Sequence, residues 1–328
     1  MSVSHLHTCA SKDWSQISAL IENWPFKPLA RLRGLDSPDL FALTAGRVIR
    51  TLESDKGAAW MMVQQNRTQG FTALSMLPWD SQQLGFAAGR IDYLVAEGGY
   101  PQQHETKKAL LRRVLNEANR RGIWHLSVRV DTNDLSTLHV LEETGFITVD
   151  NMLTFALDLT DHESPTVEHN FTIRPATIAD CEQAAQLALN IFTKDRFHAD
   201  PLINKDRADR LHAEWVRNSC KGIAADVVLL AEANDQPLGF ITGKVQHDTP
   251  AQFGQMVGTI ALVGCDEKVR GGGVGRALIS TALDWFKQQG CDVVEVGTQL
   301  RNISASRLYQ KCGFQLVGAS ASLRLVLQ

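Results

Sequence analysis

The sequence predicts an α/β protein with a mixed sheet, arranged as two tandem copies of one fold, and three observations support this. The chain has 328 residues, which is more than one hydrophobic core usually serves, so two domains are expected. A segment of the first half recurs in the second, where Ala277–Gly290 repeats the pattern of Ala109–Gly122 at an offset of 168 positions. A glycine-rich stretch, "RGGGVGR", separates a strand pattern from an amphipathic helix pattern in the second half only.

The second half gives the clearest succession of elements, each with its own local signal. "FTIRPA" alternates as a strand, and the next segment predicts a helix capped by Thr177, with Asp180 three residues later as in a capping box. Lys205–Asn218 predicts a second helix. A long helix follows the glycine stretch and stops at Gly290, and a short helix starts at Asn302. The strand patterns are "DVVLLAEA", "LGFITGKVQ", "MVGTIALVGC", "CDVVEVGT" and "GASASLRLVL".

The repeat also shows what the first copy lacks. The two copies align without a gap as far as "ETGF" in the first half and "KCGF" in the second. The identical residues lie at the first-half positions Ala109, Leu110, Leu115, Gly122, Val128, Ser136, Gly145 and Phe146. The first half has "QQHETKK" where the second has the glycine stretch. It also has Leu141 in place of Tyr309 and Asp134 in place of Asn302. The fold is therefore expected twice and the glycine loop once.

A polar stretch around Pro165 separates two apolar, periodic regions and marks the expected domain boundary. The sequence predicts a first domain over residues 1–160, a linker over 161–170 and a second domain over 171–328. Because the glycines are confined to the second domain, we expect the first to be a degenerate copy without the binding loop.

The glycine stretch predicts a site for an anion such as a pyrophosphate. A loop before a helix offers backbone N–H groups at the positive end of the helix dipole, glycines let phosphates approach the backbone, and arginines add cationic donors. The residues expected to bind are Arg270, Gly271, Gly272, Gly273, Val274, Gly275 and Arg276. A P-loop would need Lys and then Ser or Thr after its last glycine, and a dinucleotide-binding loop would need GxGxxG. Neither pattern is present here.

Four features in order resemble the GCN5-related N-acetyltransferase (GNAT) superfamily: "IRPAT" on a strand, the strand before the loop, the loop with its long helix, and "NISASRLYQKCGF". The resemblance covers residues 171–328, and the first half only as a degenerate GNAT-like copy. Two further segments resemble acetyltransferases of nucleotide-linked amino sugars such as dTDP-4-amino-4,6-dideoxyhexoses. They are "FTKDRFHADP" at Phe192–Pro201 and "LPWDSQQLGF" at Leu77–Phe86, where Gln83 and Leu84 replace that group's paired phenylalanines.

The resemblance implies an N-acetyltransferase that passes the acetyl group of its co-substrate acetyl-CoA directly to a primary amine, without a metal. Pantetheine would lie between the strand before the loop and a splayed neighbour, with a backbone N–H near Leu262 or Val263 polarising the thioester oxygen. Tyr309 would protonate the leaving thiolate, because the phenol pKa of about 10 is close to that of a thiol. Asn302 would hydrogen-bond pantetheine, cap its helix, or do both.

For the acceptor, the resemblance implies a small-molecule amine, with a sugar nucleotide as the favoured class. The acceptor contacts are expected from Arg196, His198, Asp200 and, in the first domain, Trp79. "TIALVGC" has no acidic residue or histidine, so the sequence identifies no general base on that strand. Two alternatives stay open: acetylation of another small amine, an antibiotic or a peptide amine, and a non-catalytic CoA-binding module.

Composition argues against several other classes. A formal net charge of −3 is not basic enough for a nucleic-acid footprint. No apolar run approaches the roughly 20 residues of a membrane span, and the first residues do not form a signal peptide. Six cysteines and ten histidines are scattered without metal-binding spacing, which is typical of the reducing cytosol. We therefore expect a cytoplasmic monomer or homodimer without a metal.

Overall fold

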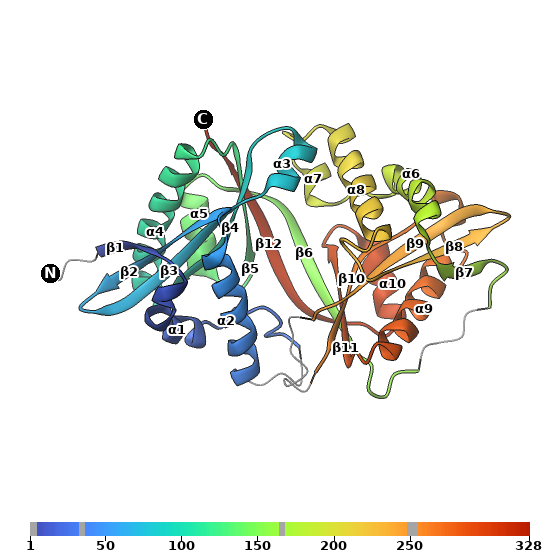
Figure 1. Ribbon diagram of the computed structural model, residues 1–328, viewed down its shortest axis with the longest axis horizontal. Coiled ribbons are helices and arrows are strands. Elements are labelled where there is room, and N and C mark those ends of the chain that lie inside the picture. Colours follow the sequence, from blue (N-terminus) through green and yellow to red (C-terminus); the bar gives the residue numbers. More distant parts are fainter. Residues whose placement is uncertain (1–4, 33–36, 164–167, 248–254) are drawn as a thin grey trace. The chain divides into compact units, whose positions relative to one another are not determined.

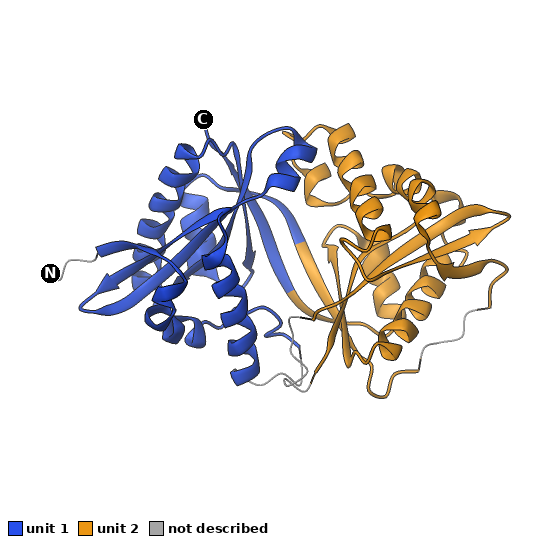
Figure 2. Ribbon diagram, viewed as in Figure 1, with its two compact units in different colours: residues 1–151, 319–328 blue, residues 152–318 orange. Residues whose placement is uncertain are grey.

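A computed structural model describes residues 5–32, 37–163, 168–247 and 255–328 of the chain. These residues form two compact units (Figure 2). Unit 1 comprises residues 1–151 and 319–328, and unit 2 comprises residues 152–318. Each unit packs helices on a sheet with both parallel and antiparallel strands, so the predicted fold class is confirmed. None of the described helices is long and apolar enough to cross a bilayer.

Unit 1 has the strand order β1-β2-β3-β4-β5-β12, in which β4 and β5 run parallel and the other neighbours antiparallel. Its strands are β1 (His5–Cys9), β2 (Gly57–Gln64), β3 (Arg67–Met76), β4 (Ala88–Ala96), β5 (His125–Asp131) and part of β12 (Gln315–Val326). Its helices are α1 (Trp14–Asn23), α2 (Ser37–Glu53), α3 (Pro78–Leu84), α4 (Tyr100–Arg120) and α5 (Leu135–Glu143). The amphipathic helix α4 buries Leu110, Leu111 and Val114 in one core, while α1 buries Ile17 and Ile21 in another.

Unit 2 has the strand order β6-β11-β10-β9-β8-β7, in which β10 and β11 run parallel. Its strands are part of β6 (Ile147–Asp158), β7 (Thr172–Pro175), β8 (Val227–Ala233), β9 (Gln236–Val245), β10 (Val257–Cys265) and β11 (Val293–Gln299). Its helices are α6 (Cys181–Ile191), α7 (Arg196–Ala199), α8 (Lys205–Cys220), α9 (Val274–Gln288) and α10 (Ile303–Lys311). Helices α6 and α8 pack on one face of the sheet, and α9 packs on the other (Figure 1).

The elements predicted for the second half are present, with small shifts at their ends. The predicted capping box forms, because the Thr177 N–H and hydroxyl both donate to the Asp180 carboxylate, at 2.7 and 2.8 Å. Arg174 donates to the same carboxylate, and these hydrogen bonds hold the pKa of Asp180 far below its usual range. The first turn, Ile178–Asp180, is a 3₁₀ helix that leads into α6.

The predicted repeat is present in the structure. At the offset of 168, β5, α5 and β6 of the first copy coincide residue for residue with β11, α10 and β12 of the second. The long helices differ at their start: α4 begins at Tyr100, whereas the start of α9 at Val274 corresponds to residue 106. The first copy therefore extends the helix through the positions that form the glycine loop in the second copy.

The boundaries of the units differ from the predicted domain limits. The chain changes unit within β6, whose residues Met152–Asp158 pair with β11, and again within β12, whose residues Ser320–Val326 pair with β5. Each unit is thus completed by a strand from the other half of the sequence. The predicted linker over 161–170 lies after β6, inside unit 2, and its residues 164–167 lie outside the described residues. The polar composition of this stretch predicted a domain boundary there, whereas the pairing of β6 and β12 sets the division between the two units.

Candidate active site

The glycine loop between β10 and α9 leaves several backbone donors without an intrahelical partner. Gly271 and Gly273 both have a φ of +85°, which residues with a Cβ rarely adopt. Gly273 is the N-cap of α9, and no side chain caps this helix. The N–H groups of Val274, Gly275 and Arg276 therefore have no acceptor within the helix. Together with the helix dipole, these donors have the chemistry that an anion site needs, and anion binding at this loop stays a prediction.

The other loop residues are exposed around these donors. Gly272 is exposed, and its N–H donates to the Val269 carbonyl at 3.1 Å, which closes the turn. The guanidinium of Arg270 donates to Glu267 at 3.1 Å, and the exposed Arg276 lies in the first turn of α9. Both arginines are close in sequence to the anion site, one before it and one within it.

Gly275 lets α10 pack closely against the start of α9. A Cβ at this position would lie 3.1 Å from Leu308 Cδ2 and 3.6 Å from Cys265 Sγ. The equivalent position of the first copy is Lys107, whose ammonium is buried and binds Asp134 at 2.8 Å and Ser136 Oγ at 2.7 Å. The equivalent position thus holds a buried ion pair in unit 1, whereas in unit 2 Leu308 and Cys265 lie directly against Gly275.

Strands β10 and β11 part at the end of the sheet that adjoins the loop. They pair from Val257 with Val293 to Ile260 with Val296 and no further, although β10 continues to Cys265. The register of β10 against β9 shifts between Ile260 and Leu262, which is a β-bulge. The splay expected between these two strands is therefore present, and it begins at the bulge.

Hydrogen bonds to β9 show which backbone group of β10 faces this gap. The Leu262 N–H donates to Thr242 Oγ1 at 2.9 Å, and the Asp266 N–H donates to the Leu238 carbonyl at 2.8 Å. Both residues direct their N–H groups toward β9, and direction alternates along a strand. Val263 therefore directs its N–H toward β11. Of the two expected donors, Leu262 is already engaged and Val263 faces the gap.

Asn302 is the N-cap of the short helix α10, and Tyr309 lies in the last turn of that helix. The Tyr309 ring is 3% exposed and packs against Phe155 and Phe314, with ring centroids 5.8 and 6.0 Å apart. Phe155 pairs across the sheet with Val296, the residue at which the splay begins. Burial raises the pKa of Tyr309 above its usual value, so its phenol is protonated at neutral pH. Asn302 caps α10, accepting hydrogen bonds from Ala305 N at 3.5 Å and Ser304 Oγ at 3.0 Å.

His198 on α7 belongs to an ion-pair network that ties α7 to α8. Its Nδ1 lies 2.5 Å from Asp195 and its Nε2 lies 2.8 Å from Asp209. Burial alone would lower the pKa of His198, but the two carboxylates outweigh it and raise the pKa. Despite its burial, Asp195 keeps a pKa of about 2, because it hydrogen-bonds His198. Because both ring nitrogens of His198 are engaged by carboxylates, this histidine is poorly placed to act as a base.

The nearby His212 completes a group of side chains with metal-binding chemistry. Ligand atoms of Asp195, His198 and His212 lie within 4.8 Å of one another. Each already has a protein partner: His198 binds carboxylates through both nitrogens, and His212 Nδ1 contacts the Ala208 carbonyl at 2.9 Å. The network is complete without an ion.

The remaining predicted acceptor residues have different surroundings. Arg196 is half-buried, with its guanidinium 4.5 Å from the centroid of the Phe197 ring. Asp200 is 2% exposed and accepts a hydrogen bond from Leu202 N, which shapes the turn after α7. Trp79 is half-buried on α3 and belongs to unit 1, whereas the other predicted residues belong to unit 2.

Arg301 is a residue that sequence reasoning missed. It precedes Asn302, and its guanidinium donates to the carbonyls of Lys194 and Asp195 at 2.9 and 3.0 Å. These bonds tie the segment before α7 to the start of α10. Its place next to the predicted Asn302 was the only signal in the sequence. Through Arg301, the predicted acceptor segment adjoins the helix that carries Tyr309.

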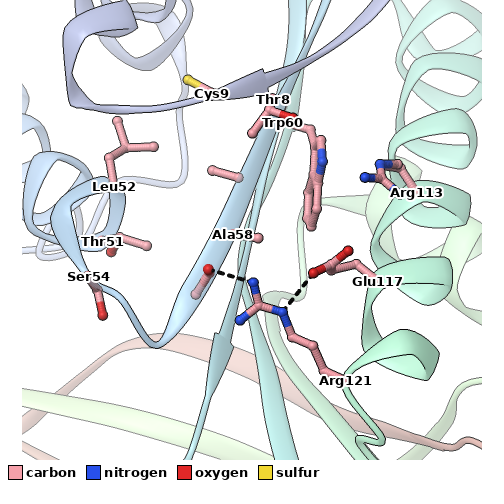
Figure 3. Close-up of a pocket in the computed structure, with 12 residues that line it drawn as sticks. Thr8, Cys9, Thr51, Leu52, Ser54, Ala58, Trp60, Arg113, Glu117 and Arg121 are labelled. Atoms are coloured by element: carbon pink, nitrogen blue, oxygen red, sulfur yellow. Dashed lines mark hydrogen bonds and ion pairs between the residues drawn. The ribbon is translucent and has the colours of Figure 1, made fainter.

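A pocket of about 370 Å³ in unit 1 has a different character (Figure 3). Glu117 and Arg121 from α4 point into it beneath Trp60, and Arg121 also donates to the Gly57 carbonyl at 3.0 Å. Hydrogen bonds from Arg120 and Arg121 hold the pKa of Glu117 at about 2, so this carboxylate is not a proton acceptor at neutral pH. None of the predicted site residues lines this pocket.

Comparison with known proteins agrees with the geometry of unit 2. Residues 188–314 match the model of the Acetyltransferase (GNAT) family. The chain is 24% identical over 254 residues to the spore coat polysaccharide biosynthesis protein SpsD of Bacillus subtilis (strain 168), which covers 77% of this chain and 82% of SpsD. It is 25% identical over 192 residues to the dTDP-fucosamine acetyltransferase of Escherichia coli O6:H1, covering 57% of this chain and 75% of that protein.

A solved structure shares the fold over nearly the whole chain. It is described as a tandem GNAT protein from the clavulanic acid biosynthesis pathway, and it aligns with a TM-score of 0.61 at 12% identity. The alignment covers 99% of this chain and 98% of that one. The fold of two tandem copies, predicted from the repeat, is confirmed.

Proposed function

We propose that this chain, an acetyltransferase with a GNAT domain, acetylates the primary amine of a nucleotide-linked amino sugar, with acetyl-CoA as donor. One observation carries the proposal. The anion site at the start of α9 adjoins the gap between β10 and β11, and Tyr309 packs where that gap begins. A pyrophosphate at the loop and an extended arm in the gap would bring a thioester to Tyr309.

The proposed reaction is direct transfer. The amine nitrogen attacks the thioester carbon, the C–N bond forms, the C–S bond breaks, and the nitrogen releases one N–H proton to solvent. The Val263 N–H stabilises the developing oxyanion, and Tyr309 gives its proton to the leaving thiolate and recovers one from solvent. The largest contribution is the alignment of amine and thioester, which supplies at best ~7–11 kcal/mol of barrier reduction. Tyr309 is protonated at neutral pH, as a general acid must be, although burial raises its pKa further above that of a thiol.

The amino-sugar acceptor is supported by two observations. The relatives named above include a dTDP-fucosamine acetyltransferase and a protein of polysaccharide biosynthesis. Arg301 also ties the segment before α7 to α10, which brings Arg196 toward the reaction centre as a partner for a nucleotide phosphate. In this proposal His198 positions α7 and takes no proton.

Unit 1 is proposed to bind no acetyl-CoA. Its copy of the site has Lys107 where Gly275 stands in unit 2, and the Lys107 ammonium is bound to Asp134. An incoming phosphate or pantetheine would have to displace this buried ion pair, and α4, which begins just after Gly98 and Gly99, continues through the positions that form the glycine loop in unit 2. Unit 1 therefore has a supporting role in the fold.

The test is thiol release from acetyl-CoA with a panel of amines that includes dTDP-4-amino-4,6-dideoxyhexoses, aminoglycosides, polyamines and peptides. We expect rapid release with a sugar nucleotide, and a loss of kcat of about 10²–10⁴-fold in Tyr309→Phe with little change in acetyl-CoA affinity. Tyr100→Phe, the same change in unit 1, is the matched control. Release only with the other amines would replace the acceptor class, and no release despite tight acetyl-CoA binding would leave a binding module.

A further inference from the structure

The pocket of about 370 Å³ in unit 1 lies beside the first residues of β2 (Figure 3). Its walls come from the end of β1, the end of α2, the start of β2 and one face of α4. Strands β2 and β4 run in the same direction, because each is antiparallel to β3. The positions that correspond to the glycine loop follow the end of β4, so they lie at the opposite end of the sheet. The pocket is therefore not the first copy of the loop site.

Three charged side chains of α4 line the pocket from one face of the helix, four residues apart. Arg121 donates to Glu117 at 2.8 Å and to the Gly57 carbonyl at 3.0 Å, which fixes both charged groups (Figure 3). Within the described part of the chain, Arg113 makes no hydrogen bond or ion pair, and its guanidinium carbon lies 5.1 Å from the centroid of the Trp60 ring. Two guanidiniums and one carboxylate give the lining a net charge of +1.

The edge of β2 adds a backbone donor to the pocket. The pairing of β1 with β2 ends at Cys9 and Ala59, so β1 does not reach Gly57. The Lys56 carbonyl accepts a hydrogen bond from Met76 N of β3 at 2.7 Å. Because direction alternates along a strand, Gly57 points its N–H and its carbonyl away from β3. That carbonyl accepts the hydrogen bond from α4 described above, so the Gly57 N–H points to the pocket side as well.

The titratable groups of the pocket favour binding over catalysis. Hydrogen bonds from Arg120 and Arg121 hold the pKa of Glu117 at about 2, so its carboxylate stays ionised at neutral pH and does not act as a base. Burial raises the pKa of the Cys9 thiol to about 12, so this cysteine is not a nucleophilic thiolate at neutral pH. What the pocket offers a ligand is positive charge beside an apolar wall.

The second copy does not repeat these charges. At the offset of 168, the three charged positions of α4 correspond to Thr281, Trp285 and Gln289. A Cβ on Gly243 of β9 would lie 3.2 Å from Trp285 Cζ3, so this tryptophan ring packs against the sheet at the position where α4 has a carboxylate. The charged lining therefore distinguishes unit 1 from unit 2.

We propose that this pocket binds a small organic acid, whose carboxylate is held by Arg113 and the Gly57 N–H and whose apolar part lies against Leu52 and Trp60. The planar guanidinium offers two parallel donors that match a carboxylate. One negative charge balances the lining, whereas a phosphate ester carries about −1.5 to −2 at neutral pH. The site gives unit 1 a ligand of its own and does not depend on the acceptor proposed for unit 2.

The test titrates ¹⁵N-labelled protein with acetate, butyrate and benzoate, and separately with inorganic phosphate. The indole N–H resonance of Trp60, assigned by its loss in Trp60→Phe, reports occupancy. At least one carboxylate should give a saturable shift, and Arg113→Gln should raise its Kd about 10–100-fold. Arg113→Lys keeps the charge but loses the planar fork, so its Kd should lie in between. Arg112→Gln, the same change at the exposed neighbour, should leave the Kd unchanged.

Three results would overturn the inference while leaving the proposed function intact. The first is no saturable shift with any of the carboxylates. If the melting temperature of Arg113→Gln is also lowered, Arg113 has a structural role over the Trp60 ring. The second is an equal Kd for the wild type and for a folded Arg113→Gln variant, since the carboxylate then binds elsewhere. The third is tighter binding of phosphate than of every carboxylate, which would contradict the charge balance of the lining.

Discussion

Replacing Lys107 by methionine tests whether unit 1 depends on the ion pair that closes its copy of the site. The side chains of Lys107 and Asp134 are only 3% and 7% exposed, and their charged atoms lie 2.8 Å apart. Burial lowers the pKa of Lys107, and the contact with Asp134 opposes that shift. Removing the lysine leaves a buried carboxylate without its counter-ion, which typically costs about 3–5 kcal/mol.

The neighbouring Lys108 supplies the control. It pairs with Glu143 at the same distance of 2.8 Å, but these side chains are 35% and 45% exposed, so Lys108→Met should cost less than about 1 kcal/mol. The double variant Lys107→Met/Asp134→Asn should recover most of the lost stability, because it removes the unpaired carboxylate. It also gives α5 an asparagine N-cap, as Asn302 gives α10. Urea unfolding, together with hydrogen exchange in α4 and α5, measures the loss of stability in Lys107→Met and its recovery in the double variant. Similar losses for the two lysines would refute the reasoning.

Two further predictions concern the loop and the network on α7. Gly271→Ala places a Cβ at a φ of +85°, at a backbone cost of about 1–2 kcal/mol, and should weaken acetyl-CoA binding by roughly 5–30-fold. Gly272→Ala is the control and should change the Kd less. Equal increases in the Kd of the two variants, measured by calorimetry, would count against the loop geometry. For His198, the raised pKa means that its stabilising contribution is full below the unfolded pKa of about 6.5 and is lost as the pH rises through the folded pKa. The difference in unfolding free energy between wild type and His198→Asn should therefore shrink with rising pH. A difference that does not depend on pH would contradict the raised pKa of His198. The same substitution at the exposed His247, His247→Asn, is the control.

The predictions that succeeded were those that depend on neighbours in sequence. Helix caps, alternation and a glycine stretch before a helix are local signals, so the elements of the second half, including the glycine loop before α9, could be found from the residues alone. The repeat succeeded for the same reason, because one offset relates β5 to β11 and α5 to α10.

The features that escaped prediction depend on contacts between distant residues. Lys107 and Asp134 are ordinary charged residues until the fold buries them together. His198 looked available for an acceptor, but α8 brings Asp209 to its second nitrogen. The pairing of β12 with β5 joins segments almost 200 residues apart in the chain, and no local pattern reports it. The choice of Val263 over Leu262 likewise required the hydrogen bond to Thr242.

The exchange of strands between the two halves also sets an order for biosynthesis. Unit 1 needs residues 319–328, which are translated long after its other strands. At about 5–20 residues per second, the roughly 170 intervening residues take on the order of 10–30 s to translate. During that interval the β5 edge has no partner strand, and an uncovered edge invites pairing with other chains. Unit 1 of the nascent chain therefore cannot be completed until residues 319–328 have been made.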